Sequence, residues 1–254
     1  MYYKTDKMSC FYEKHGNNNK IILILPGWGD TRNTFRYLID YLKNDYTIYI
    51  LDYPGFGNSP FPDHDLDIFD YTMYIIQFMN HFSIKNPIII SHSFGGRISI
   101  LLTGFYNIQV SKMILISSAG IKQKRTLKNI IKTYTYKLLK KINFFLPKNK
   151  REQYKKKLLN TFGSSDYSKL SSNMMKTFRQ IIDQDLSCYL SNINSEVLLI
   201  WGEIDEDTPL KDGLLMRKKM KHSALITIPN SSHYVHLQNP LLVNKIVKEF
   251  IKSE

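Results

Sequence analysis

Short apolar runs that stop at small or turn-forming residues recur along this chain, and they restrict its fold more than any other feature. Four of them cover residues 20–25, 87–90, 112–117 and 196–201. A strand without polar alternation belongs in a sheet covered on both faces, because a solvent-facing side would show a polar residue at every second position. Helical spacing separates the runs, and this alternation predicts an α/β fold with a mostly parallel central sheet flanked by helices.

The expected elements follow in chain order. Residues 8–15 begin an antiparallel edge, another strand starts at Pro87, and the remaining strands cover 20–25, 46–52, 112–117, 196–201 and 224–228. One helix starts near Gly95, and the others cover 34–42, 69–82, 174–189, 210–220 and 240–251. No internal repeat interrupts this order, so the strands belong to one sheet.

The composition changes sharply after residue 120. Residues 121–160 contain 14 lysines and arginines but a single acidic residue, Glu152, so this stretch carries as much net charge, +13, as the whole chain. Apolar residues at helical spacing predict a basic amphipathic helix here; they are Leu127, Ile131, Tyr134, Leu138 and Ile142. We expect a lysine-rich helical cap at residues 121–190, inserted between two parts of one core domain, 1–120 and 191–254.

Composition also bounds the class of protein. With 254 residues and 43% hydrophobic residues, the chain can bury a large core. Its cysteines, Cys10 and Cys188, are too few for a disulfide framework or a zinc site and are expected to be reduced thiols. Charged residues near the start and the lack of a long apolar stretch predict a cytoplasmic protein.

A serine lies where one of the buried strands turns into a helix. The pattern is Ser91-His92-Ser93-Phe94-Gly95, which fits G-x-S-x-G except that Ser91 replaces the first glycine. Such a turn lifts its central side chain above the sheet edge, where a serine can act as a nucleophile. Small residues are needed around it because a larger side chain would clash with the neighbouring helix.

A serine nucleophile requires a base and a carboxylate that orients the base. Asp205 follows the strand at 196–201, and His233 lies in the loop after the strand at 224–228. Asp207 and His236 are rivals for these two roles. The alternative roles are a cap of the helix after Pro209 for Asp207 and a core or rim position for His236. Asp52 is expected to have a structural role in a turn.

The order Ser93, Asp205, His233, together with the turn at Ser93, resembles the α/β-hydrolase superfamily over nearly the whole chain. Further matching pieces are Leu25-Pro26-Gly27-Trp28-Gly29, the stretch 51–59, Trp201-Gly202-Glu203-Ile204-Asp205, and Ser232-His233 before Asn239-Pro240. The resemblance implies a capped serine hydrolase fold. It also implies that the backbone N–H groups of Trp28 and Phe94 form an oxyanion hole, although Pro26 occupies a position that is usually histidine.

Three functions are compatible with this resemblance. The leading hypothesis is a cofactor-independent serine hydrolase that cleaves an ester, thioester or related acyl bond. The second is carbon–carbon bond hydrolysis or pyruvate elimination, because the menaquinone-pathway lyases carry an arginine four residues after the serine, as Arg97 does. The third is a non-catalytic binding protein. Arg97 and Arg125 are candidate substrate-binding residues, and neither a metal site nor a dinucleotide-binding fingerprint is predicted.

The basic cap leaves three interpretations open. It can be a solvated lysine-rich face, a surface that recruits an acidic acyl substrate, or a site of peripheral contact with an anionic membrane, since Phe144-Phe145-Leu146 lies beside lysines. Nucleic acid is not an expected partner, because no recognised reading motif accompanies the charge. The resemblance to serine hydrolases implies a small acyl compound, which can be acidic, as the partner, and the sequence does not predict the oligomeric state.

Overall fold

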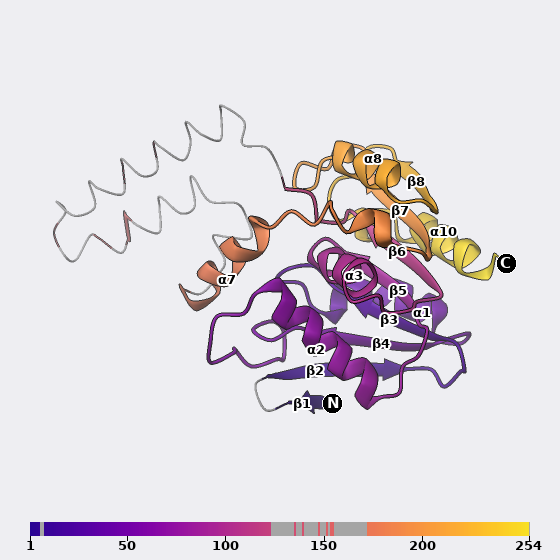
Figure 1. Ribbon diagram of the computed structural model, residues 1–254, viewed down its shortest axis with the longest axis horizontal. Coiled ribbons are helices and arrows are strands. Elements are labelled where there is room, and N and C mark those ends of the chain that lie inside the picture. The colour runs from indigo at the N-terminus through magenta and orange to yellow at the C-terminus, as the bar shows by residue number, and fades with distance from the viewer. Residues whose placement is uncertain are drawn as a thin grey trace.

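The computed structural model describes residues 1–5, 8–122 and 172–253, and between 122 and 172 only residues 135, 139, 147, 151, 153 and 154. These residues contain an eight-stranded sheet with the strand order β1-β2-β4-β3-β5-β6-β7-β8 (Figure 1). The strands are β1 (Tyr2–Lys4), β2 (Ser9–His15), β3 (Ile21–Leu25), β4 (Thr47–Asp52), β5 (Ile88–His92), β6 (Lys112–Ile116), β7 (Glu196–Gly202) and β8 (Ser223–Ile228).

The sheet is parallel from β4 to β8, which confirms the mostly parallel arrangement predicted from the apolar runs. β2 pairs with β4 in the antiparallel direction, as expected for residues 8–15. It is not the edge, however, because β1 pairs with its outer side. Only Tyr3 is buried among the three residues of β1, so its sequence lacks a pattern that would have revealed it.

Helices cover both faces of the sheet. They are η1 (Arg32–Phe35), α1 (Arg36–Leu42), α2 (Ile68–His81), α3 (Phe94–Gly104), α7 (Ser172–Ile182), η3 (Leu190–Asn192), α8 (Leu210–Lys219), α9 (Val235–Gln238) and α10 (Pro240–Lys252). Along β3, Leu23 and Leu25 pack in the core shared with α2, α3 and α8. Ile22 and Ile24 pack on the opposite face with α1 and α10. Burial on both faces explains why the strand has no polar alternation.

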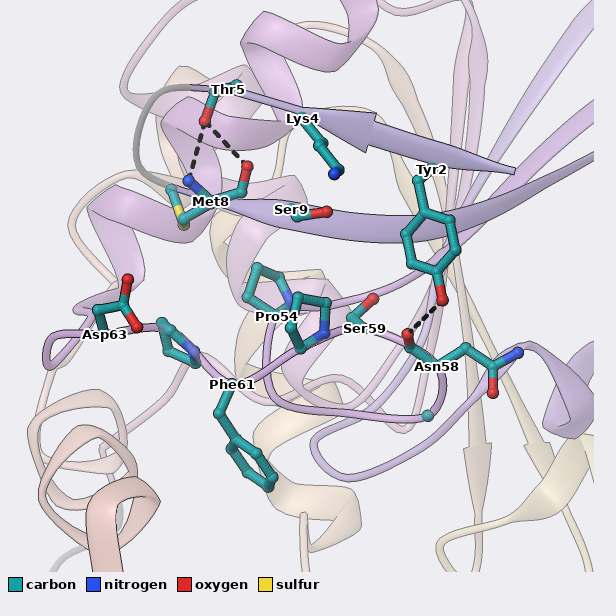
Figure 2. Close-up of a pocket in the computed structure, with 13 residues that line it drawn as sticks. Tyr2, Lys4, Thr5, Met8, Ser9, Pro54, Asn58, Ser59, Phe61 and Asp63 are labelled. Carbon is teal, nitrogen blue, oxygen red and sulfur yellow. Dashed lines mark hydrogen bonds between the residues drawn. The ribbon is translucent and has the colours of Figure 1, made fainter.

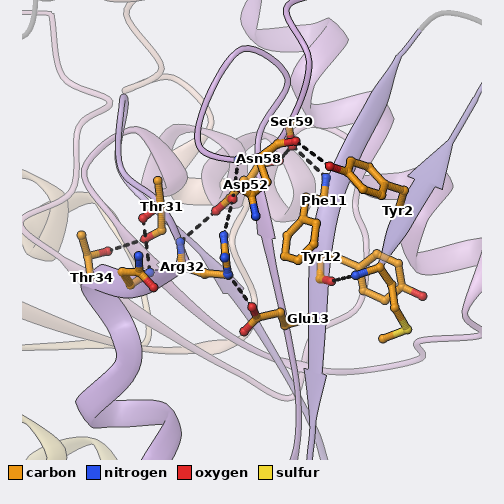
Figure 3. Close-up of polar contacts among 12 residues, drawn as sticks. Tyr2, Phe11, Tyr12, Glu13, Thr31, Arg32, Thr34, Asp52, Asn58 and Ser59 are labelled. Atoms are coloured by element: carbon orange, nitrogen blue, oxygen red, sulfur yellow. Dashed lines mark hydrogen bonds and ion pairs between the residues drawn. The ribbon is translucent and has the colours of Figure 1, made fainter.

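The turn after β4 is fixed by a buried aspartate (Figure 3). Asp52 accepts the backbone N–H of Arg32 at 2.9 Å and that of Asn58 at 3.0 Å, and its carboxylate pairs with the Arg32 guanidinium at 2.7 Å. The same guanidinium bonds to Glu13 on β2 and lies over the ring of Phe11. These contacts tie the loops after β3 and β4 to the sheet, which is the structural role expected for Asp52.

The predicted cap falls largely outside the described residues. The basic helix expected over residues 127–142 and the candidate Arg125 both lie there, and the boundaries of the cap stay a prediction. α7 is described, but it ends at Ile182 instead of residue 189. Beyond it, Leu186 donates its N–H to the carbonyl of Gly120 at 2.8 Å. This N–H is therefore bonded to the loop after β6 instead of to a carbonyl of a continuing helix. None of the described helices is long and apolar enough to span a membrane.

Candidate active site

Ser93 lies at the junction of β5 and α3 in a strained backbone conformation. Its φ is 48° and its ψ is −109°, a region that residues other than glycine rarely occupy and that costs about 1–3 kcal/mol. Bonds to the neighbouring strand hold it there: the Ser93 N–H donates to the Ile116 carbonyl at 3.1 Å, and its carbonyl accepts from Ala119 at 3.0 Å. The sheet therefore fixes the direction of the serine side chain.

Close packing around the turn accounts for its small residues. A Cβ atom on Gly95 would lie 2.0 Å from the Leu25 carbonyl oxygen, and one on Gly96 would lie 1.8 Å from the hydroxyl of Ser118. Ser91, at the position of the usual first glycine, is fully buried on β5, and its hydroxyl lies 3.5 Å from the Ile114 carbonyl oxygen. A serine side chain thus fits where the pattern normally has glycine.

The loops after β7 and β8 bring Asp205 and His233 together. His233 Nδ1 lies 3.0 Å from Asp205 Oδ2 and 3.2 Å from Oδ1. The carboxylate of Asp205 is buried, whereas the His233 side chain is one-tenth exposed. Because a carboxylate accepts hydrogen bonds, the Nδ1 atom of His233 carries hydrogen and Nε2 is left as the base in the neutral ring.

Backbone N–H groups of the turn that follows Asp205 hold its carboxylate in place beside His233. Oδ1 accepts the N–H groups of Asp207 at 3.0 Å and Thr208 at 2.9 Å. Burial is the largest effect on the pKa of Asp205 and would raise it, but the hydrogen bond and charge of His233, with the Thr208 N–H, lower the pKa below its ordinary value. Asp205 is therefore an anion beside the ring.

Thr208 is a member of this site that the sequence did not reveal. Its hydroxyl lies 2.9 Å from Asp205 Oδ2, 3.0 Å from the Ser117 carbonyl oxygen and 3.2 Å from His233 Nδ1. A hydroxyl has one hydrogen, so it donates to one of the two oxygens at a time. The signal in the sequence is the spacing Asp-x-x-Thr, in which the aspartate accepts from the backbone N–H three residues later.

A cavity of about 510 Å³ opens above the turn, and Ser93 and His233 both line it. Trp28, Phe178 and Ile181 give it an apolar wall. Charged residues of both signs also line it: the basic residues Arg97, Lys122 and Arg179 and the aspartates Asp183, Asp207 and Asp212. Asp205 does not line the cavity but lies behind His233, as expected of a residue that orients a base.

The two expected oxyanion donors come from neighbouring loops. Phe94 begins α3, where a backbone N–H has no acceptor within its own helix. Trp28 lies inside the tight turn in which Asp30 donates its N–H to the Gly27 carbonyl at 3.3 Å. The rings of Trp28 and Phe94 are in contact, with centroids 5.1 Å apart. Both residues line the cavity with Ser93, and Pro26 does not prevent this arrangement.

His236 and Asp207, the alternatives to His233 and Asp205, lie in different surroundings from those two residues. His236 is buried and stacks on Phe35 with ring centroids 4.8 Å apart, which is the core position considered as its alternative role. Burial, with His92 and His233 nearby, lowers the pKa of His236 well below its ordinary value. Asp207 is exposed and does not cap α8, since the residue at that position is Pro209 and no side chain bonds there.

Arg97 lies in the cavity wall as a buried cation. It is 5% exposed and donates from Nη1 to the Gln184 carbonyl at 2.9 Å. Burial lowers its pKa to about 10, and the charge of Asp185 opposes this shift. A buried acidic residue in the wall, Asp212 on α8, was missed because an aspartate in a first helical turn is explained by the helix dipole alone.

Two other features do not form an alternative site. Asp205, Asp207 and His233 bring potential metal-ligand atoms within 4.8 Å of one another, but the Asp205–His233 bond already occupies Nδ1. A hollow of about 580 Å³ lies between β1, β2 and the loop at residues 54–63 (Figure 2). No histidine is among its described lining residues, and the hydroxyl of Ser59 is bonded to Asp52 and Phe11.

Comparison with known proteins agrees with this geometry. The chain matches the model of the alpha/beta hydrolase fold family over residues 20–240. It is 26% identical over 271 residues to the uncharacterized hydrolase YugF of Bacillus subtilis (strain 168), covering 98% of this chain and 97% of the relative. It is 28% identical over 264 residues to the pimeloyl-[acyl-carrier protein] methyl ester esterase of Wigglesworthia glossinidia brevipalpis, covering 96% of this chain and 98% of the relative.

Solved structures are similar in fold. An esterase from Exiguobacterium antarcticum has a TM-score of 0.75 and 19% identity over 97% of this chain and 96% of its own. A bacterial membrane phospholipase A has a TM-score of 0.77 and 19% identity over 99% of this chain and 84% of its own. The relatives named as hydrolases and esterases support a hydrolase that acts on esters. The chain belongs to the α/β-hydrolase family, which confirms the resemblance read from its motifs.

Proposed function

We propose that this protein is a serine hydrolase that cleaves an ester or related acyl bond through an acyl-enzyme. The observation that supports it most is the buried Asp205–His233 pair beside a strained serine, with Ser93 and His233 lining one cavity. Ser93 would attack the acyl carbonyl while His233 Nε2 takes its proton. Asp205 would stabilise the imidazolium that forms.

The negative charge on the carbonyl oxygen would be held by the N–H groups of Trp28 and Phe94. Each such donor contributes about 3–4 kcal/mol to stabilisation of the transition state. His233 would then protonate the leaving alcohol, and water would attack the acyl-enzyme with His233 again as the base. These steps need no group beyond the side chains and backbone of the chain.

The cavity wall suggests the substrate class. Trp28, Phe178 and Ile181 suit an acyl chain. Arg97, Lys122 and Arg179 are the groups that would bind an acidic end, in a wall that also contains Asp183, Asp207 and Asp212. The relative from Wigglesworthia is named for an ester carried on an acyl-carrier protein. We therefore favour an acyl ester with an acidic end or an acidic carrier.

A fluorophosphonate probe tests the nucleophile. We expect stoichiometric labelling of the wild type, loss of labelling in Ser93→Ala, and a fall in kcat of about 10⁴-fold or more on p-nitrophenyl esters. Ser223→Ala is the matched control, because Ser223 begins the edge strand β8 and bonds to backbone carbonyls. Labelling that persists in Ser93→Ala would remove Ser93 from this role.

A panel of short-chain and long-chain esters separates the other functions. Turnover of any of them supports the esterase. Probe labelling without turnover of any ester would favour carbon–carbon bond chemistry, in which Arg97 contacts the substrate. Failure of both assays would favour a binding protein on the same fold.

A further inference from the structure

A buried histidine immediately precedes the nucleophile and contacts two separate loops of the site. His92 is the last residue of β5 and is fully buried. Its Nε2 lies 3.1 Å from the backbone carbonyl oxygen of His233, and its Nδ1 lies 3.2 Å from Oδ2 of Asp30. One imidazole ring therefore joins the loop of the base to the loop that carries Trp28.

The chemistry of the two partners restricts the protons in this bridge. A carbonyl oxygen only accepts, so Nε2 of His92 must carry hydrogen. The Nδ1–Oδ2 contact then needs a hydrogen of its own, either on Nδ1 facing a carboxylate or on the carboxyl group facing a bare nitrogen. The pair is therefore either an imidazolium ion with a carboxylate or a neutral imidazole with a carboxylic acid. Both forms contain one proton more than a neutral imidazole with a carboxylate.

The backbone at Gly27 packs directly against the bridge. A Cβ atom on Gly27 would lie 2.5 Å from Asp30 Oδ2 and 2.8 Å from His92 Nδ1, so this glycine lies directly against the hydrogen bond. The other oxygen of Asp30 accepts from the Tyr234 hydroxyl at 3.1 Å. The oxyanion turn, from Gly27 to Asp30, thus packs on the pair itself.

Other rings face His92 from the loop after β8. The centroids of His233 and His236 lie 4.7 Å away, and that of Tyr234 lies 5.0 Å away. Burial keeps His236 in its neutral form, as its lowered pKa indicates. Asp30 is the carboxylate bonded to the ring, so it is the group that can balance a charge on His92.

We propose that His92 and Asp30 form a proton-sharing pair that positions the base and the oxyanion turn relative to Ser93. The pair touches neither substrate nor reacting atoms, so both are positioning residues. This inference deepens the proposed function and rests on it for its catalytic consequence. A displacement of about 1 Å in a catalytic group can lower a rate about 100-fold, so the bridge has a measurable effect.

Substitutions of Asp30 test whether the bridge needs the carboxylate. In Asp30→Asn the amide can donate to bare Nδ1 while Nε2 still donates to the His233 carbonyl, so the bridge is kept. In Asp30→Ala the partner of Nδ1 is removed.

The experiment compares Asp30→Asn, Asp30→Ala and wild type at one neutral pH. We expect the probe-labelling rate and kcat of Asp30→Ala to fall about 10- to 100-fold with KM changed less than about threefold. Asp30→Asn should keep both rates within about fivefold of the wild type. Tyr234→Phe removes a hydrogen bond to the same carboxylate but leaves the bridge, so its loss should be smaller than that of Asp30→Ala.

A spectroscopic readout makes the bridge testable apart from catalysis. In ¹⁵N–¹H ring spectra, assigned by signal loss in His92→Gln, Nε2 of His92 should be protonated in the wild type and in Asp30→Asn. An unprotonated Nε2 in the wild type would overturn the proposal, as would an Asp30→Asn variant that loses as much activity as Asp30→Ala. The ring spectrum of the wild type decides the matter even if Asp30→Ala does not fold. A wild type that the probe does not label would instead refute the serine hydrolase, while the ring spectrum would still report on the bridge.

Discussion

Asp52 and Asp205 are two buried aspartates: Asp52 is the last residue of the parallel strand β4, and Asp205 follows the parallel strand β7. Both accept two backbone N–H bonds from nearby loops. They differ in the side chain that each carboxylate pairs with. Asp52 pairs with the guanidinium of Arg32, which stays charged at every physiological pH. Asp205 pairs with the imidazole of His233, a group that can accept and release a proton in a reaction.

The difference shows how one carboxylate arrangement serves two purposes. Beside a permanent charge, the carboxylate fixes the positions of loops and nothing in the pair changes during a reaction. Beside an imidazole, the same carboxylate controls which nitrogen holds hydrogen and supports a transient cation. Substitutions at the two positions should therefore affect different measurements, activity for Asp205 and stability for Asp52.

The largest expected effect is on activity, in Asp205→Asn. The asparagine oxygen can still accept from Asp207 and Thr208, but its amide would donate to Nδ1 of His233 and move the ring hydrogen to Nε2. We expect kcat/KM on an ester to fall about 10⁴-fold, with little change in the urea midpoint. Asp207→Asn should lower it less than tenfold. The opposite ranking would assign the orienting role to Asp207.

The next effect is on stability, in Asp52→Ala. Removing the carboxylate leaves the Arg32 guanidinium with Glu13 as its remaining acid and leaves two backbone N–H groups without their acceptor, and each unsatisfied buried donor typically costs about 1–3 kcal/mol. Urea unfolding should show this loss, while the folded fraction keeps kcat within about threefold. Glu13→Gln changes the more exposed acid of the same network and should cost less than about 1 kcal/mol. Equal losses in the two variants would contradict the assigned role of Asp52.

The smallest effect concerns Asp212, an aspartate in the cavity wall whose pKa is shifted in the opposite direction to that of Asp205. Burial raises the pKa of Asp212 to about 6, with the charge of Asp205 adding to the rise and Lys211 opposing it. The folded state therefore holds a proton that the unfolded chain releases, and ionisation of Asp212 destabilises the protein as the pH rises through 6. Asp212→Asn should be more stable than the wild type above pH 6, by at most about 3 kcal/mol.

Urea unfolding at several pH values between about 4 and 8 tests this sign. The two proteins should differ least at the acid end, where both side chains are neutral. A stability difference that does not grow between the acid and alkaline ends would show that Asp212 is already ionised at low pH.

The elements that sequence could predict are those with a continuous pattern. The strand at residues 20–25 and the helix at 240–251 lie within one residue of β3 and α10, because burial on two faces or on one stripe leaves a regular spacing. β1 and α9 were missed, since three or four residues are too few to show a period. The end of α7 depends on the bond between Leu186 and Gly120, which lies 66 residues away in sequence and has no local signal.

The same distinction applies to the site. Ser93, Asp205 and His233 each follow a strand, so the order of strands was enough to name them as candidates. Thr208 and His92 depend on contacts between loops, and His92 bonds to residues 62 and 141 positions away in sequence. A buried histidine next to a serine does not by itself indicate either partner.

The attachment of α7 has a consequence for altering the substrate range. Met174 packs against Gly55, and the Thr177 hydroxyl accepts from the Leu66 N–H at 3.2 Å, so this wall of the cavity is fastened to the loop that follows Asp52. Laboratory evolution for new substrates can therefore act at a distance from the pocket. Changes in the turn at residues 53–59 would tilt Phe178 and Ile181 without altering any group that performs the chemistry.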